Sequence, residues 1–123
     1  MKSLILSKEI REGKLNDKEI IKCLDIQHNQ VLVSAISQII SRKRCNEEII
    51  SKLTCISKFR DPNVNKLFGI DTIGHYSIAA LFALDTLESK RKYEELMADL
   101  DDWDKEIVKR IVEGVALYGQ LGI

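Results

Sequence analysis

The sequence is poor in the residues that interrupt helices. It has one proline and six glycines among 123 residues, and these two residue types are the least compatible with a helix interior. Charged residues make up 31% of the chain and hydrophobic residues 45%, which argues against a disordered chain. The composition therefore predicts one helical domain, long enough to bury a core without metals or disulfides.

The chain also has no net charge when its histidines are neutral. Nineteen basic residues balance nineteen acidic residues, so no overall field attracts nucleic acid. Residues 1–60 carry twelve basic and seven acidic groups, a net of +5, whereas residues 61–123 carry seven basic and twelve acidic groups, a net of −5. The two halves of the chain therefore have opposite sign.

Cysteine is rare and has no metal-binding or redox spacing. Cys23, Cys45 and Cys55 are an odd number without a CxxC pair, so we expect reduced thiols and a cytoplasmic protein. Long hydrophobic runs are missing as well. The apolar residues at 4–6 are too few for a signal peptide, and the most apolar stretch, residues 73–87, is too short to span a membrane.

The sequence also lacks the motifs of a metal site, a phosphate-binding loop or a catalytic set. His28 and His75 lie far apart, and neither belongs to an HExxH motif. His75 follows Asp71 by one turn, so Asp71 could orient it, but the favoured interpretation is a histidine partly buried near a helix start. Pairing of His75 with Cys23 or Cys55 as a nucleophile is a weaker alternative, because nothing in the neighbouring sequence activates these thiols. We therefore expect no enzyme activity, no cofactor and no metal.

What the sequence does contain is a helical pattern of apolar residues between capping signals. The stretch 73–87 has no wide polar face, so we expect it to be a central helix that is covered on several sides. Further helices are predicted at 3–12 with Gly13 as the stop, from Asn16 or Asp17 to about 26, at about 30–41, after Asn46, at 93–100 and at 102–118.

Several expectations concern helix ends and faces. Asp61 and Pro62 have the pattern of a helix start, which predicts a short element containing Val64, Leu67 and Phe68. The basic runs 42–44 and 90–92 are expected to end the helices before them, because cations are favoured at helix C-termini. The last helix is expected to bury one side, formed by Trp103, Ile107, Ile111, Val115 and Tyr118, with Val108 and Val112 beside them.

The chain is weakly similar to itself at a spacing of about 44 residues. Residues 17–40 align with residues 61–84, with identities at Asp17/Asp61, Lys22/Lys66, Ile26/Ile70 and Ala35/Ala79. This pattern resembles HEAT and armadillo repeats and predicts an all-α fold, a short α-solenoid with a leading helix at 3–12 and units at about 17–60, 61–103 and 104–118. In such a stack the Ser and Gln side of 30–41 would face solvent. An irregular helical bundle is the alternative.

Carboxylates are concentrated at residues 94–106, where seven acids accompany one basic residue, Lys105. The segment 99–104 lacks the glycine turn and the glutamate spacing of an EF-hand loop. It is either a solvated connection whose aspartates cap the last helix, or an acidic docking surface. In the second case Trp103, the only tryptophan, would be its anchor rather than part of the buried side.

A small helical-repeat chain without a catalytic motif is typical of a protein-binding module. In size, helical fold and charge it resembles the immunity proteins of bacterial contact-dependent inhibition systems. That resemblance implies that the protein binds and neutralises a cognate toxin, often a cationic nuclease, although no shared motif assigns residues. For this function we expect Tyr93 and Trp103 as apolar anchors, with steering and ion-pairing carboxylates at Glu94, Glu95, Asp99, Asp101, Asp102 and Asp104.

Two other functions are weaker alternatives. Nucleic-acid binding would use the basic runs 42–44 and 90–92 along one edge, but the runs are short and lack interleaved aromatic residues. A regulatory or scaffold function without a toxin is the other. We expect no membrane association, and the sequence leaves the oligomeric state open. Reversal of Asp101 and Asp102 to Lys is expected to slow association with a cationic partner, less so at high salt.

Overall fold

A computed structural model describes residues 2–67 and 70–118 of the chain, with side chains at 3–67 and 70–114. Within these ranges the chain forms seven α-helices and no β-strand, which confirms the predicted all-α fold. None of these described helices is both long and apolar enough to cross a membrane. The helices are α1 (Lys2–Arg11), α2 (Asp17–Cys23), α3 (Asn29–Ser41), α4 (Glu47–Ile56), α5 (Ile73–Ala83), α6 (Leu87–Ala98) and α7 (Asp102–Tyr118).

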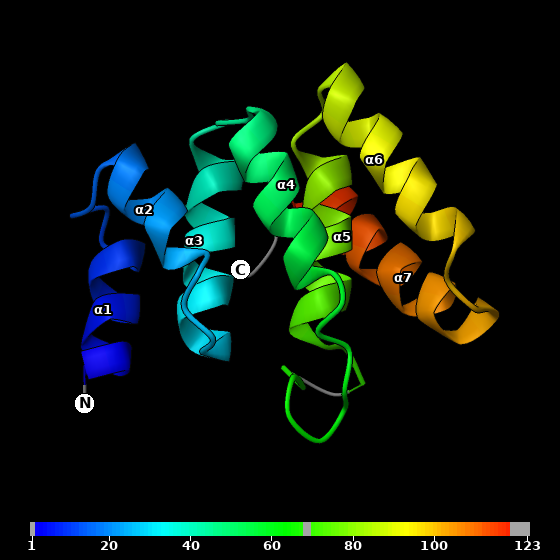
Figure 1. The fold of residues 1–123 in the computed structure, drawn as a ribbon, viewed down its shortest axis with the longest axis horizontal. Helices are drawn as coiled ribbons and strands as arrows, with labels where there is room; N and C mark the ends of the chain where they lie inside the picture. Colours follow the sequence, from blue (N-terminus) through cyan, green and yellow to red (C-terminus); the bar gives the residue numbers. More distant parts are fainter. Residues whose placement is uncertain (1, 68–69, 119–123) are drawn as a thin grey trace.

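Four of the helices form a row, in which α1 contacts α3, α3 contacts α5, and α5 contacts α7. The other three pack against this row, α2 on α3 and both α4 and α6 on α5. In Figure 1 the α1–α2, α3–α4 and α5–α6 connections lie along the upper side, and the α2–α3, α4–α5 and α6–α7 connections along the lower side. One hydrophobic cluster, extending from Ile10 in α1 to Val108 in α7, fills the space between the helices.

The helix α5 is the centre of this arrangement, as its sequence predicts. Every residue from Ile73 to Leu81 is buried, including Gly74, His75 and Ser77. The helix contacts α3, α4, α6 and α7, so it is covered on several sides. Its buried Ser77 hydroxyl donates to the Leu53 carbonyl of α4 at 2.6 Å, which satisfies a polar group that would otherwise destabilise the core.

Capping residues set most helix ends where the sequence predicts them. Asn16 caps α2 through reciprocal hydrogen bonds with Glu19, both 2.9 Å long. The Asn46 side chain accepts the backbone N–H of Ile49 at 2.8 Å and caps α4. Gly13 follows α1 with a φ of 75°, the left-handed conformation that glycine adopts without a steric cost.

The predicted helix 73–87 is wrong at its C-terminal end. The chain leaves α5 at Leu84, and Asp85 adopts a φ of 59°, which no right-handed helix includes. Thr86 then begins a new helix: it exchanges hydrogen bonds of 3.0 Å with Ser89, backbone to side chain in each direction. Because this capping pair is local, α5 and α6 are separate helices.

Two further expectations fail for the same reason. The basic run 90–92 lies inside α6 and ends no helix, and the predicted helix at 93–100 is the second part of α6. Lys90 instead reaches back to the break, where it pairs with Asp85 at 2.5 Å and lies 5.2 Å from the ring centroid of Phe82. The hydrogen bond and charge of Lys90 lower the pKa of Asp85.

The predicted helix at Pro62 is also wrong. The Asp61 carboxylate accepts the Asn63 N–H at 2.9 Å, and Asn65 accepts the Asp61 N–H at 3.1 Å, which makes a turn instead. An isolated bridge between Lys66 and Thr72 follows. Of the residues expected in the helix, Phe68 lies outside the described residues.

The Ser and Gln side of α3 faces solvent only in part, because Gln30 and Ser41 are exposed whereas its middle is covered. Ser34 is buried and lies 2.6 Å from the buried Ser7 hydroxyl of α1, which also donates to the Gln30 carbonyl. Ser37 lies 2.7 Å from the Tyr76 hydroxyl of α5. Ser34 and Ser37 are therefore paired with α1 and α5, a pairing that the alternation of apolar and polar residues does not reveal.

The internal similarity corresponds to structure only in part. The helices α3 and α5 begin at Asn29 and Ile73, 44 positions apart, and both belong to the row. The segment aligned with α2, residues 61–67, forms the turn described above. The common feature is therefore one helix of the row.

Candidate functional site

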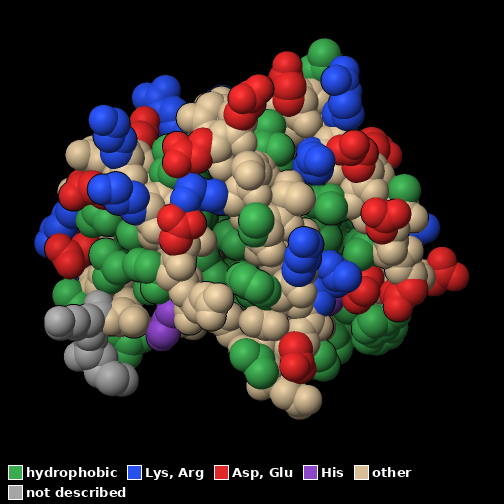
Figure 2. Space-filling model, viewed as in Figure 1, with side chains coloured by type: hydrophobic (Ala, Val, Ile, Leu, Met, Phe, Trp, Pro, Cys, Tyr) green, Lys and Arg blue, Asp and Glu red, His purple; other side chains and the backbone are tan. Residues whose placement is uncertain are grey.

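The acidic segment of the sequence lies where α6 leads into α7. Figure 2 shows acidic side chains crowded at the right-hand end of the molecule, over the end of α6 and the start of α7. The exposed carboxylates of the predicted surface are those of Glu94, Glu95, Asp99, Asp101 and Asp102. The remaining three residues of the predicted surface are Tyr93, Trp103 and Asp104, and each has a different environment.

Trp103 is on the surface, and its expected place on the buried side of α7 is wrong. Its exposed fraction is 62%, whereas Ile107 is 2% and Val108 0% exposed. Asp104, with a side chain only 21% exposed, takes the inward position in the first turn. The inner side of α7 therefore begins with a carboxylate, one residue later than predicted. Side chains of the expected Val115 and Tyr118 lie outside the described residues.

The Asp104 carboxylate faces inward because two partners, His75 and Arg60, lie beside it. Its Oδ1 is 2.8 Å from His75 Nε2, and its Oδ2 is 3.5 Å from Arg60 Nε. His75 is 2% exposed and is the third residue of α5, while Arg60 follows α4. This cluster, hereafter the His75–Asp104–Arg60 junction, joins the start of α7 to the start of α5 and the end of the α4 segment.

Thr72 holds the imidazole of His75 in place. The Thr72 backbone N–H donates to Nδ1 at 3.1 Å, and the Thr72 hydroxyl lies 2.8 Å from the same atom. As an acceptor Nδ1 carries no proton, so the ring proton is on Nε2 and is donated to Asp104. His75 is thus buried near a helix start as predicted, with both ring nitrogens hydrogen bonded.

The glycine next to His75 allows the chain before the turn to lie against α5. The Gly74 N–H donates to the Phe59 carbonyl at 2.9 Å. A Cβ at Gly74 would lie 2.6 Å from Arg60 Cγ and 2.8 Å from the Ser57 carbonyl. Arg60 also donates to that Ser57 carbonyl. The small size of Gly74 therefore brings Arg60 within reach of Asp104.

Besides Asp104, three residues of the predicted surface have structural contacts. Asp101 accepts the Asp104 backbone N–H at 2.8 Å and so caps α7. Glu95 pairs with Lys92 at 3.0 Å. Tyr93 is 8% exposed and packs on Phe82, with ring centroids 5.3 Å apart; burial, and secondarily the charge of Glu94, raises its pKa. Glu94, Asp99, Asp102 and Trp103 remain as exposed groups without such contacts among the described residues.

Most residues of the two basic runs form ion pairs within the chain. Arg42 and Arg44 pair with Asp17 of α2 at 2.9 and 2.8 Å. The hydrogen bond from Arg42, followed by the charge of Arg44, lowers the pKa of Asp17. The run 90–92 lies on α6, and its Lys90 and Lys92 pair with nearby carboxylates.

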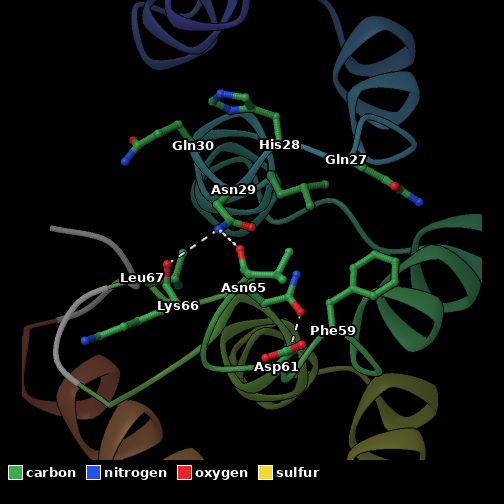
Figure 3. Close-up of a pocket in the computed structure, with 11 residues that line it drawn as sticks. Gln27, His28, Asn29, Gln30, Phe59, Asp61, Asn65, Lys66 and Leu67 are labelled. Atoms are coloured by element: carbon green, nitrogen blue, oxygen red, sulfur yellow. Dashed lines mark hydrogen bonds between the residues drawn. The ribbon is translucent and has the colours of Figure 1, made fainter.

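A separate hollow of about 670 Å³ lies between the start of α3 and residues 59–67 (Figure 3). Asn29 crosses its edge and donates to the Val64 carbonyl at 3.0 Å. The charged residues of the lining are Asp61 and Lys66, and the rest are mostly amides and apolar groups. The hollow contains no residue of the predicted surface, and sequence reasoning gave no indication of it.

The weaker enzymatic interpretation pairs His75 with Cys23 or Cys55. The ring nitrogens of His75 bond to Thr72 and Asp104. Cys23 is buried, which, together with Glu19, raises its pKa, and Cys55 is exposed on α4. Among the described residues no three His, Cys, Asp or Glu side chains are grouped so that they could hold a metal.

Sequence reasoning missed the junction. Asp104 was expected among the surface carboxylates, and Arg60 and Thr72 were not singled out at all. His75 and Asp104 are separated by 29 positions, and no motif spacing connects them. Comparisons with protein-family models, with curated proteins and with solved structures gave no match.

Proposed function

We propose that this chain is a protein-binding module that docks a basic partner at the end of the molecule where α6 meets α7. Trp103 is the apolar anchor, and Glu94, Asp99 and Asp102 form the steering rim. Tyr93 supports the surface from beneath, because its ring is buried against Phe82. The protein acts by binding and without a cofactor.

The observation that carries this proposal is the exposure of Trp103. A tryptophan that is 62% exposed leaves a large apolar area in water. It lies beside Asp102 and within four positions of Asp99, both exposed and unpaired among the described residues. A tryptophan next to exposed carboxylates is typical of an interface anchor with an electrostatic rim.

The arrangement of the helices supports the finer architecture that we propose, a short α-solenoid. In a solenoid each unit contacts its neighbours, and the last unit has one free side. The row α1–α3–α5–α7 has this order of contacts, and Trp103 lies on its last helix. We further propose that the chain is cytoplasmic and belongs, by size and charge, with immunity proteins that neutralise a cationic toxin.

Capture with a matched control tests the proposed function. The chain and its Trp103→Ala variant are immobilised side by side and exposed to an extract of the native host. We expect a basic protein, such as a toxin encoded beside this chain, to be retained by the unaltered chain only. A tryptophan at the centre of an interface contributes about 2–4 kcal/mol, so the variant should bind roughly 30- to 1000-fold more weakly. Equal retention by both chains would contradict the proposal.

The charge rim is tested by association kinetics with the captured protein. Asp101 caps α7, so its reversal would disturb the helix as well as the charge. Asp99→Lys with Asp102→Lys leaves that cap intact. We expect slower association that approaches the unaltered rate as salt rises. A salt-independent difference would remove the carboxylates from the interface.

Nucleic-acid binding has less support. The two basic runs lie on different elements, and Arg42 and Arg44 are paired with Asp17. Filter binding over a range of salt concentrations separates the two functions, since phosphate contacts give a steep dependence on salt.

A further inference from the structure

We infer that Asp104 is a positioning residue that keeps Trp103 on the surface. The inference rests on the proposed function, because it explains how the anchor of the docking surface is presented. Asp104 does so through the His75–Asp104–Arg60 junction, without itself contacting the partner.

Two side chains compete for the inward position in the first turn of α7. Trp103, Ile107 and Ile111 follow one another at intervals of four residues. Asp104 precedes Ile107 by three residues and Val108 by four. Either Trp103 or Asp104 therefore continues the buried side of the helix toward its start. A local change in the first turn that leaves Ile107 and Val108 buried would exchange them, whereas rotation of the whole helix would also turn Val108 outward. Apolar burial alone favours Trp103 in the inward position.

The junction decides the competition in favour of Asp104. Its carboxylate accepts from His75 Nε2 at 2.8 Å and faces Arg60 Nε at 3.5 Å. Exchange with Trp103 would leave the ring proton of His75, a residue 2% exposed, without an acceptor. It would also separate Arg60 from its carboxylate partner and place an indole beside both.

The partners of Asp104 cannot follow it outward. Thr72 holds the other nitrogen of His75, and the Ser57 carbonyl holds Arg60. The Asp104 backbone N–H is itself fixed by the Asp101 cap at 2.8 Å. The first turn of α7 is therefore attached at both its backbone and its inward side chain, and Trp103 projects outward as a consequence.

The fluorescence of Trp103, the only tryptophan in the chain, reports its environment directly. We expect Asp104→Ala to shift its emission to shorter wavelength and to reduce quenching by acrylamide. Asp104→Asn retains an oxygen acceptor for His75 Nε2, so it should restore the emission of the unaltered chain. Asp102→Ala, at an exposed neighbour, is the matched control and should change neither property.

A folded Asp104→Ala variant whose tryptophan stays as accessible as in the unaltered chain would overturn the inference. If that variant does not fold, proton exchange in the unaltered protein tests the inference. Its His75 Nε2 proton should be protected from solvent exchange, whereas the indole N–H of Trp103 should exchange freely. A protected indole or a freely exchanging His75 proton would overturn the inference. Neither measurement uses a partner, so failure here leaves the capture experiment as a separate test of the proposed function.

Discussion

Single polar side chains hold the helices of this protein in register. The buried hydroxyls of Ser7 and Ser34 meet between α1 and α3, at 2.6 Å. Arg11 adds a hydrogen bond of 2.7 Å to Ser7. Tyr76 links α5 to Ser37 of α3 at 2.7 Å. Since a buried polar group without a partner costs about 1–3 kcal/mol, each such pair disfavours displacement of one helix along the next.

Tyr76 should make the stability of the protein sensitive to alkaline pH. Burial raises its pKa to about 12 from 10.0, with the hydrogen bond to Ser37 opposing and the charge of Asp71 adding to the rise. Only the unfolded chain ionises this tyrosine between pH 10 and 12, so its contribution is complete below pH 10 and is lost as pH rises toward 12. Two pKa units correspond to roughly 2–3 kcal/mol.

Urea denaturation at several pH values between 9 and 12 measures this loss. Tyr76→Phe cannot ionise, so its stability should fall less steeply over that range than the stability of the unaltered chain. Parallel pH dependence of the two proteins would show that the Tyr76 hydroxyl does not ionise differently in the folded and unfolded states.

Gly74 should tolerate no side chain. A Cβ would lie 2.7 Å from the Phe59 carbonyl, to which the Gly74 N–H is bonded, as well as against Ser57 and Arg60. We expect Gly74→Ala to destabilise the fold by about 1–3 kcal/mol or more. Gly114 in α7 is the matched control, because nothing lies within 4 Å of its Cβ position. Gly114→Ala should stabilise the fold by roughly 0.5–1 kcal/mol, and equal effects in thermal unfolding would contradict the prediction.

At the scale of elements, capping residues close in the sequence determine where most of the helices begin. Amide and hydroxyl caps begin α2, α4, α5 and α6. Two ends instead contain non-glycine residues in the left-handed region, Lys43 after α3 and Asp85 after α5. Asp85 gains an ion pair with Lys90, whereas the exposed Lys43 has no such contact within the described residues.

Replacement of Lys43 by glycine should therefore stabilise the protein. A φ of 55° is strained for lysine and unstrained for glycine. Part of the gain is offset by the greater freedom of glycine in the unfolded chain, which leaves roughly 0.5–1 kcal/mol. Thermal unfolding measures the change. Lys43→Ala keeps the strain, and a gain of equal size in that variant would show that the backbone conformation is not the cause.

At the scale of the whole molecule, the three cysteines differ in how deeply they are buried. Cys23 is buried in α2, Cys45 is partly buried near the Thr86 cap of α6, and Cys55 is exposed on α4. The reactive species of a thiol is its thiolate, and burial, with Glu19, raises the pKa of Cys23. The thiols therefore differ in both access and ionisation.

We expect a disulfide reagent such as DTNB to modify Cys55 first and Cys23 last in the native protein. The reaction of Cys23 should accelerate with urea in step with global unfolding, because its neighbours in the core must separate first. Cys55→Ser should remove the fastest phase and Cys23→Ser the slowest. Fast modification of Cys23 without denaturant would show that α2 opens independently of the core.

Much of the fold is determined by interactions within a few positions of the sequence. The caps at Asn16 and Asn46 bond to residues three positions later, and α5 is apolar on all sides, so both could be predicted from the sequence. The helix predicted over residues 73–87 ends early because Thr86 and Ser89 form a cap within a continuous apolar run. The helix predicted at Pro62 is a turn because Asp61 and Asn65 bond to each other.

The sequence by itself determined an all-helical chain, its central helix and the concentration of carboxylates at residues 94–106. Only the tertiary structure decided which side chain of the first turn of α7 faces inward, and with it whether Trp103 is core or surface. A helical period permits both settings, and the choice depends on Asp104 meeting His75 and Arg60 across 29 and 44 positions. Those contacts depend on how the helices pack, so no local pattern of residues reveals them.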